Sequence, residues 1–200
     1  MPRSPDPALE GKLVAAALRL LDRGGEPAIT LRAVAKEAGT TTPSIYERFR
    51  SREALMRRLV DEATNEIVAI LQPKASVEAM FDEYLRYSRA HPMRLNLMVT
   101  TFGARFVAGD EMPAFELLKL RIADQVGIKG RPCEDLALAI ASLAFGTAQG
   151  VIAAGKGTRQ AAEFHRTSRQ ALRMLLAAFC AANKGRPTAR RAKPRSPASR

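Results

Sequence analysis

The stretch of residues 30–49 constrains the fold more than any other part of the chain. Apolar side chains recur at three- and four-residue steps over 31–38, which predicts a short helix. Gly39 follows and can adopt the left-handed backbone conformation that ends a helix. A proline, which is favoured at the first helical position, opens a second short helix over 43–48, with Thr42 as its cap. Two short helices joined by a tight turn with glycine predict a helix-turn-helix.

The second of these helices is too short to be stable by itself. We expect helices at 8–21 and 52–71 to support it, with Ile45 and Phe49 turned toward the core. Its outward face carries hydroxyls, a phenol and a cation: Thr40, Thr41, Thr42, Ser44, Tyr46 and Arg48. Five further cations surround it: Arg32, Arg50, Arg52, Arg57 and Arg58. Such hydroxyls can approach DNA bases and such cations can meet phosphates, but each also occurs as an ordinary cap, turn or surface residue.

The rest of the chain also shows helical periodicity, and no segment alternates with a period of two over a useful length. Proline and glycine separate the segments, and Thr30, Ser51, Ser76 and Thr158 precede four of them as helix caps do. The sequence therefore predicts an all-α fold of about nine helices. Their expected ranges are 7–21, 31–38, 43–48, 52–71, 77–90, 92–102, 112–126, 133–154 and 159–182.

The charge of the chain is concentrated at its two ends. Lysine and arginine number 32 against 20 acidic residues, a formal net charge of +12. The last segment, 184–200, contains seven cations and no acidic residue. This segment is too polar and too rich in proline to be buried, so we predict that it is disordered. Basic ends around a nearly neutral centre suit a partner that is a polyanion.

Composition indicates a globular cytoplasmic protein. The hydrophobic share of 46% can support a core, and the N-terminus lacks the pattern of a secretory signal. We expect no apolar run of the roughly 20 residues that cross a bilayer, and hence no membrane protein. Two distant histidines and unclustered cysteines predict no metal site and no cofactor. Without a carboxylate pair, a nucleophile with its base or a phosphate-binding glycine motif, the chain is not expected to be an enzyme.

Three motifs follow one another in the N-terminal part: ITLRAVAKEAG, then TTTPSIYERF, then RSREAL before a long fourth helix. Over residues 8–60 the chain resembles the N-terminal DNA-binding domain of TetR-family transcriptional regulators. The resemblance implies double-stranded DNA as a partner. Together with the outward face described above, it gives these candidate DNA-binding residues: Thr30, Arg32, Thr41, Thr42, Pro43, Ser44, Tyr46, Arg48 and Arg52.

The resemblance also implies individual roles. The start of the recognition helix, 41–44, matches the positions that approach bases, and Tyr46 matches a tyrosine that binds phosphate. Arg52 stands where members of the family usually have lysine, and Arg48 where they often have histidine, so both can form forked phosphate contacts. The recognition helix has no arginine, asparagine or glutamine near its start, so sequence preference would depend on methyl contacts and DNA shape.

The helices predicted at 133–154 and 159–182 are apolar over more than one stripe, and such helices need neighbours on several sides. The resemblance implies a homodimer in which this pair forms a four-helix interface with the same pair of a second subunit. The residues predicted for this interface are Leu143, Ala144, Ala148, Val151, Ala171, Leu172, Leu175 and Phe179. The alternative, that the pair only completes the core of one chain, stays open.

The three helices predicted between 77 and 126 carry many aromatic residues and a few polar ones. This set suits a mostly apolar cavity for a small molecule. The predicted ligand-binding residues are Phe81, Tyr84, His91, Met98, Phe102, Phe106 and Phe115. The alternative is that these aromatic residues are plain core.

Together, these features predict a ligand-responsive dimeric transcriptional regulator, with a repressor favoured over an activator. It would bind a palindromic DNA operator and be released by an apolar small-molecule effector. Its expected parts are a helix-turn-helix domain (1–51), a connecting helix that acts as a lever (52–71), a ligand-binding and dimerisation domain (72–183) and a basic tail (184–200). The alternatives are a nonspecific architectural DNA-binding protein or a helical-bundle carrier of small molecules.

Overall fold

The computed structural model describes residues 7–183, and within this range the chain is built of nine α-helices, one 3-10 turn and no β-strand. The predicted all-α class is confirmed. The elements are α1 (Pro7–Gly24), η1 (Glu26–Ala28), α2 (Leu31–Glu37), α3 (Thr42–Arg48), α4 (Arg52–Leu71), α5 (Val77–Ala90), α6 (Pro92–Ala108), α7 (Pro113–Val126), α8 (Arg131–Ala154) and α9 (Arg159–Asn183). The largest difference from expectation is α6, which continues six residues beyond 102.

Side-chain caps begin the helices at the predicted places. The hydroxyls of Thr30, Ser51, Ser76 and Thr158 each accept a hydrogen bond from the backbone N–H three residues later, at 3.1–3.2 Å. Gly39 has a φ of +67°, the left-handed conformation expected after α2. Local sequence chemistry therefore sets where these helices start and stop.

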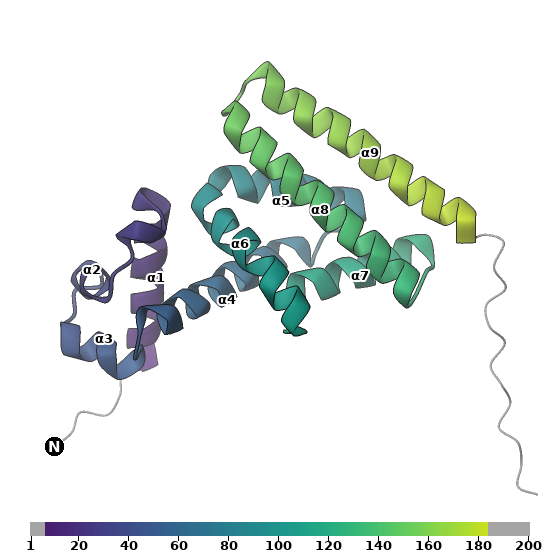
Figure 1. Ribbon diagram of the computed structural model, residues 1–200. Coiled ribbons are helices and arrows are strands. Elements are labelled where there is room, and N and C mark those ends of the chain that lie inside the picture. Colours follow the sequence, from purple (N-terminus) through teal and green to yellow (C-terminus); the bar gives the residue numbers. More distant parts are fainter. Residues whose placement is uncertain (1–6, 184–200) are drawn as a thin grey trace, which may run out of the picture.

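The helices form two packed units, which we call the head and the body (Figure 1). The head consists of α1, α2, α3 and the first half of α4, around a core that includes Leu13, Val34, Ile45 and Leu59. The body consists of α5, α7, α8 and α9 with the second half of α4 and much of α6, around two adjoining cores. Figure 1 shows the head at one end of the molecule, with α8 and α9 side by side at the far end of the body.

Helix α6 takes part in both units. Leu97 is buried in the core of the head, whereas Leu95, two residues earlier, is buried in the core of the body. Residues two apart on a helix point in nearly opposite directions, so α6 lies between the units and contributes to each. The helix predicted at 52–71 was expected to connect the parts of the molecule as a lever. In the structure α6 also contributes to both units.

Helix α8 is the most apolar long helix of the body. Residues 136–154 contain no charged side chain, and among the described helices α8 is the one that is long and apolar enough to cross a membrane, by length and composition alone. The sequence prediction concerned an uninterrupted apolar run, and Ser142, Thr147 and Gln149 interrupt this one. In the structure α8 packs against α5, α7 and α9, with Leu136, Ile140 and Ala148 among its buried residues. The core helix of a globular fold also meets these criteria. The predicted disordered tail, 184–200, lies outside the described residues.

Candidate DNA interface and effector cavity

The short helix α3 is fixed by its own residues and by the rest of the head. Thr41, rather than the predicted Thr42, is its cap: the Thr41 hydroxyl accepts a hydrogen bond from the Ser44 N–H at 3.4 Å. The hydroxyls of Thr41 and Ser44 are also hydrogen-bonded to each other, at 2.9 Å. Ile45 is fully buried and Phe49 nearly so, which anchors the helix to the core of the head. Thr42 therefore does not cap α3, and its hydroxyl is not used for that hydrogen bond.

Helix α2 is held against α1 by two ion pairs. Arg19 and Arg23 of α1 lie 3.0 and 2.7 Å from the carboxylate of Glu37 at the end of α2. Hydrogen bonds from Arg19 and then Arg23 lower the pKa of Glu37, so this carboxylate stays ionised at neutral pH. Surface pairs of this kind contribute little stability individually. Burial of Leu31, Val34 and Ala35 in the core of the head fixes α2, and with it the turn that carries α3.

The outward face of α3 is open to solvent, as the sequence predicted. Thr41, Thr42, Pro43 and Tyr46 are exposed, and 53% of Tyr46 is accessible. Ser44 and Arg48 are half-buried. Thr30 and Arg32 at the start of α2 are exposed too, although the Thr30 hydroxyl caps α2. The head therefore presents hydroxyls, a phenol and cations around the start of α3.

Arg52 is engaged within its own chain, so its predicted role in DNA binding stays a prediction. Its Nε donates to the carbonyl oxygen of Ile29 at 2.9 Å, and its Nη2 donates to the carbonyl and carboxylate oxygens of Glu26 at 3.0 and 3.2 Å. The fork is therefore directed at its own chain, where it joins α4 to the loop before α2. Arg58 is likewise paired within the chain, with Glu10 and Glu62. The remaining cations around α3, Arg32, Arg50 and Arg57, are exposed.

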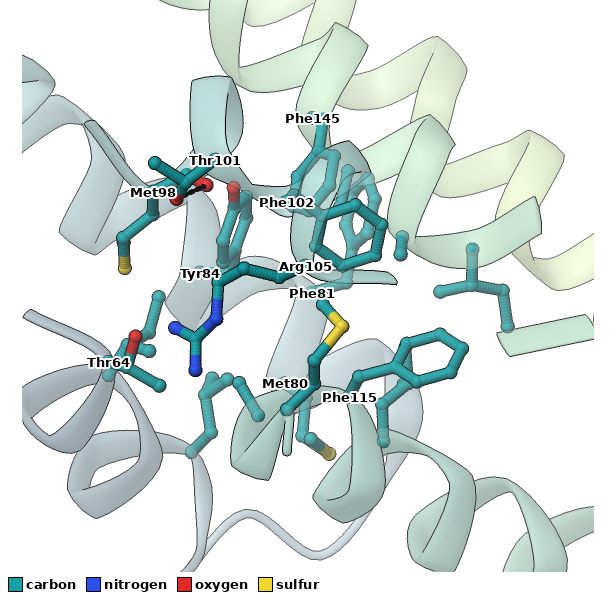
Figure 2. A pocket seen from close by; sticks show the side chains of 18 of the residues that line it. Thr64, Met80, Phe81, Tyr84, Met98, Thr101, Phe102, Arg105, Phe115 and Phe145 are labelled. Carbon is teal, nitrogen blue, oxygen red and sulfur yellow. Dashed lines mark hydrogen bonds between the residues drawn. The ribbon is translucent and has the colours of Figure 1, made fainter. Parts of the chain in front are cut away.

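A cavity of about 130 Å³ lies inside the body, between α4, α5, α6, α7 and α8 (Figure 2). Of the predicted ligand-binding residues, five line it: Phe81, Tyr84, Met98, Phe102 and Phe115. Their role in binding stays a prediction. Two others do not line it. Phe106 is largely exposed and stacks on Phe102 from outside, and His91 packs on the ring of Tyr87 in a separate shallow hollow.

The sequence analysis did not predict several residues that line the cavity. Most of them lie on α4 and α8, and two are the polar residues Thr101 and Arg105 on α6. The missed residues include Val60, Thr64, Ile67, Thr101, Arg105, Met112, Ile140, Ala141 and Phe145. Thr101 and Arg105 lie three and seven positions after Met98, the spacing of one helix face, so this periodicity could have revealed them. The contribution of α4 and α8 carried no such signal, because both helices read as ordinary core helices.

An ion-pair cluster joins the head to the body beside the cavity. Arg94, near the start of α6, contacts Asp22 of α1 and Glu66 of α4, at 2.5 and 2.6 Å, and only 13% of its side chain is exposed. Glu66 also accepts a hydrogen bond from the Tyr87 hydroxyl of α5 at 3.0 Å. Residues of four helices therefore form one connected cluster around this guanidinium. Because α6 also lines the cavity, this cluster links a helix of the cavity wall to α1.

Replacing Arg94 by methionine is expected to lower the free energy of unfolding by about 1–3 kcal/mol, since hydrogen bonds to charged groups are lost while both carboxylates remain. Arg86→Met is the matched control, because Arg86 also pairs with a glutamate but has 65% of its side chain exposed. For this control we expect a change within about 0.5 kcal/mol. Urea unfolding of both variants measures the difference. Equal losses in the two variants would contradict a special role for Arg94.

The residues exposed on α8 and α9 are not the ones predicted for the dimer interface. Ala144, Ala148, Val151 and Leu172 are buried inside the chain, so they hold these helices to the body and cannot meet a second subunit. This part of the prediction is corrected. Leu143, Ala171, Leu175 and Phe179 are half-buried.

An uncharged stripe is exposed on α8 instead, with helical spacing, and apolar side chains continue it onto α9. The residues of this stripe on α8 are Leu138, Ser142, Gly146, Gln149 and Ala153. On α9, Phe164 and Met174 are 47% and 65% exposed, and Ala178 is exposed beside them. Phe164 lies directly over Gly150, where an added Cβ would be 2.8 Å from its ring, so the two helices are in close contact. Large apolar side chains exposed together on an uncharged surface indicate an interaction site.

Comparison with known proteins agrees with this geometry. Residues 13–59 match the family model described as bacterial regulatory proteins of the tetR family. This range contains α2, α3 and most of α1, the helices that present the outward face of α3. Residues 13–59 thus form a TetR-family domain. The resemblance predicted from the sequence is confirmed.

Solved structures similar to the whole chain share the TetR fold. A TetR-family transcriptional regulator from Streptomyces coelicolor has a TM-score of 0.66 at 19% identity, covering 86% of this chain and 99% of that one. A TetR variant from Acinetobacter baumannii AYE, in complex with minocycline, has a TM-score of 0.62 at 16% identity, covering 85% and 95%. The multidrug binding protein EbrR, complexed with imidazole, has a TM-score of 0.60 at 20% identity, covering 88% and 93%. No curated protein matches this chain.

Proposed function

We propose that this TetR-family chain is a dimeric transcriptional regulator that binds a palindromic operator through α3 and releases it when a small molecule enters the body. The observation that carries the proposal is the position of α6. This helix contributes Leu97 to the core of the head that supports α3, and Met98, Thr101, Phe102 and Arg105 to the cavity. A ligand that moves α6 therefore acts on the domain that presents α3. The protein acts in the cytoplasm and is not an enzyme.

The exposed start of α3 supports base contacts. Thr42 and Pro43 are exposed and uncharged, so they can approach base edges and the methyl group of thymine. Tyr46, beyond them on the same face, can donate its hydroxyl to a phosphate oxygen, which fixes the position of the head without reading sequence. With no bidentate side chain at these positions, selectivity depends in part on the shape of the duplex.

Dimerisation through the uncharged stripe of α8 and the apolar side of α9 supports a palindromic site. A two-fold axis at that surface leaves both heads exposed, because the head lies at the other end of the molecule (Figure 1). Two recognition helices about 34 Å apart meet successive major grooves on one face of a duplex. The operator is then an inverted repeat.

The effector acts by preferring one arrangement of the two heads. A ligand shifts such an equilibrium only by its difference in affinity for the two states, and a preference of about 100-fold corresponds to about 2.7 kcal/mol. The cavity between α4 and α6 is placed for this role, because both helices continue into the head. The minocycline and imidazole complexes of two similar structures support a small-molecule site in the body.

Variants of two arginines near the start of α4 distinguish a side chain that contacts phosphate from one that holds the fold together. Arg50→Ala, at an exposed site, is expected to weaken binding to all duplexes and to reduce the slope of log affinity against log salt concentration by about one. Arg52→Ala is expected to leave that slope unchanged while it lowers the melting temperature, because it removes the bonds to Ile29 and Glu26. Binding isotherms at several salt concentrations and thermal melts measure both. A reduced slope for Arg52→Ala would show that it contacts DNA after all.

Selection from a randomised duplex pool tests the proposed function directly. The purified full-length protein should enrich an inverted repeat, whose half-site spacing reports the distance between the two heads. Enrichment without a motif would favour the nonspecific architectural protein. Absence of any retained duplex would favour a small-molecule carrier and contradict the regulator.

A further inference from the structure

The cavity suits a compact apolar ligand. Phe102 lies with its ring edge-on to Phe115 and Phe145, at centroid distances of 6.1 and 4.9 Å. Aromatic side chains in this arrangement favour a further ring as neighbour. The volume of about 130 Å³ is close to the roughly 150 Å³ that accommodates benzene in an apolar cavity. The space is therefore of the size that holds one aromatic ring.

The charge of the residues that line the cavity is of one sign, positive. Among the described residues that line the cavity, Arg105 is the one with a charge, and no carboxylate is among them. A cationic ligand would meet a like charge and no carboxylate among these lining residues, which is unfavourable in a site of low dielectric constant. Figure 2 shows the Arg105 guanidinium on the side of the cavity where Thr64 lies. An anionic head group would meet an opposite charge there.

The guanidinium of Arg105 has donors to spare. Its Nη2 donates to the carbonyl oxygen of Glu111 at 2.9 Å. The carboxylates of Asp61 and Asp110 lie 3.7 Å from its Nη1 and Nε, which is beyond hydrogen-bonding distance, and both residues are more than half exposed. These two carboxylates can remain in water if a ligand replaces them. Arginine forms its strongest contacts with carboxylates, through two parallel hydrogen bonds.

A second polar group in the lining has no partner. The Tyr84 hydroxyl is buried and makes no hydrogen bond to any described residue, since the nearby Ser88 hydroxyl donates to the Tyr84 carbonyl oxygen at 2.7 Å instead. Burial raises the pKa of Tyr84, so its phenol stays protonated. A buried donor without an acceptor is costly, and a ligand oxygen would remove that cost.

From these contacts we propose that the effector is a compact aromatic carboxylate, held by Arg105 at its carboxylate and by Phe102, Phe115 and Phe145 around its ring. Tyr84 donates a hydrogen bond to an oxygen of the same ligand. This inference deepens the proposed function, since it assigns a chemical class to the effector of that site. It concerns binding to the free protein and is separate from the recognition of DNA.

Three probes of similar size and different charge test the assignment: benzoate, benzamide and benzylamine, which at pH 7.5 are anionic, neutral and cationic. Calorimetric titration into the full-length protein without DNA should show the benzoate binding at least about tenfold more tightly than the amide, and the amine more weakly than both. In Arg105→Gln the preference of benzoate over amide should fall below about threefold. Tyr84→Phe should weaken the benzoate and the amide alike.

Arg131→Gln is the matched control, because Arg131 is exposed on α8 and pairs with Asp135 away from the cavity. It should keep the full preference for the benzoate, and melting curves should show that every variant is folded. Equal binding of the three probes, a preference for the amine, or no binding of any probe would overturn the assignment. A benzoate preference lost in Arg105→Gln supports it even if duplex selection fails, in which case the regulator proposal alone is rejected.

Discussion

Two carboxylates placed on the exposed stripe of α8, by Ser142→Glu with Gly146→Glu, are expected to convert the proposed dimer into monomers and to lower operator affinity by about 10²–10⁴-fold. A dimer binds its second half-site as an intramolecular event, and this gain in affinity disappears when the two heads are separated. Around a two-fold axis each new charge faces its symmetry mate or another uncharged helix surface. Like charges desolvated in this way are strongly unfavourable.

The substitutions leave the monomer intact. Both positions are exposed, and a Cβ added at Gly146 would have no atom within 4 Å. Glutamate also has a higher helix propensity than serine or glycine. Sedimentation measures the mass of the variant, and fluorescence anisotropy with the selected duplex measures its affinity.

Arg173→Glu serves as the control, because it places the same carboxylate on the exposed, charged side of α9. This control should remain a dimer. A double variant that stays dimeric and keeps its affinity would move the interface to another surface. A monomeric variant that still binds the palindrome at full affinity would contradict the need for two heads.

Leu97→Ala is expected to lower the stability of the head by about 2–5 kcal/mol, although Leu97 belongs to a helix of the body. Its side chain is 5% exposed and packs in the core that contains Ile45 and Leu59. Removing it leaves a cavity under the domain that supports α3. DNA binding should fall with it, because α3 is too short to keep its conformation without that support.

Leu95→Ala is the matched comparison, since Leu95 lies on the opposite side of α6 and is fully buried in the core of the body. Hydrogen exchange measured by mass spectrometry distinguishes the effects of the two variants. Leu97→Ala should accelerate exchange in α1 and α2, whereas Leu95→Ala should do so in α7 and α8. The same pattern in both variants would contradict the division of α6 between the two cores, and with it the proposed route from cavity to α3.

Most of the helical framework could be predicted from the sequence, because caps, prolines and glycines act locally. Ser51 and Ser76 begin helices where their position indicated, and Gly39 ends one. The cap of α3 was misplaced by one residue, since a run of three threonines offers equivalent caps. The register is decided by Ile45 and Phe49, which must both reach the core of the head.

The roles of single residues were harder to predict where they depend on distant partners. Arg52 binds carbonyl oxygens 23 and 26 residues earlier in the chain, and no local pattern reveals this. On α8, small and uncharged residues occur on every side of the helix, so its sequence does not show which side faces the body. Packing against α5, α7 and α9 buries Ala144 and Ala148 and leaves Ser142 and Gly146 exposed.

The affinity of the full-length protein for its selected inverted repeat, compared with a scrambled duplex of the same composition, tests the central claim most directly. If α3 is presented outward twice per dimer, anisotropy at physiological salt should give a ratio of at least about 10³, with two chains bound per duplex. Equal affinity for the two duplexes, or one chain bound per duplex, would contradict it.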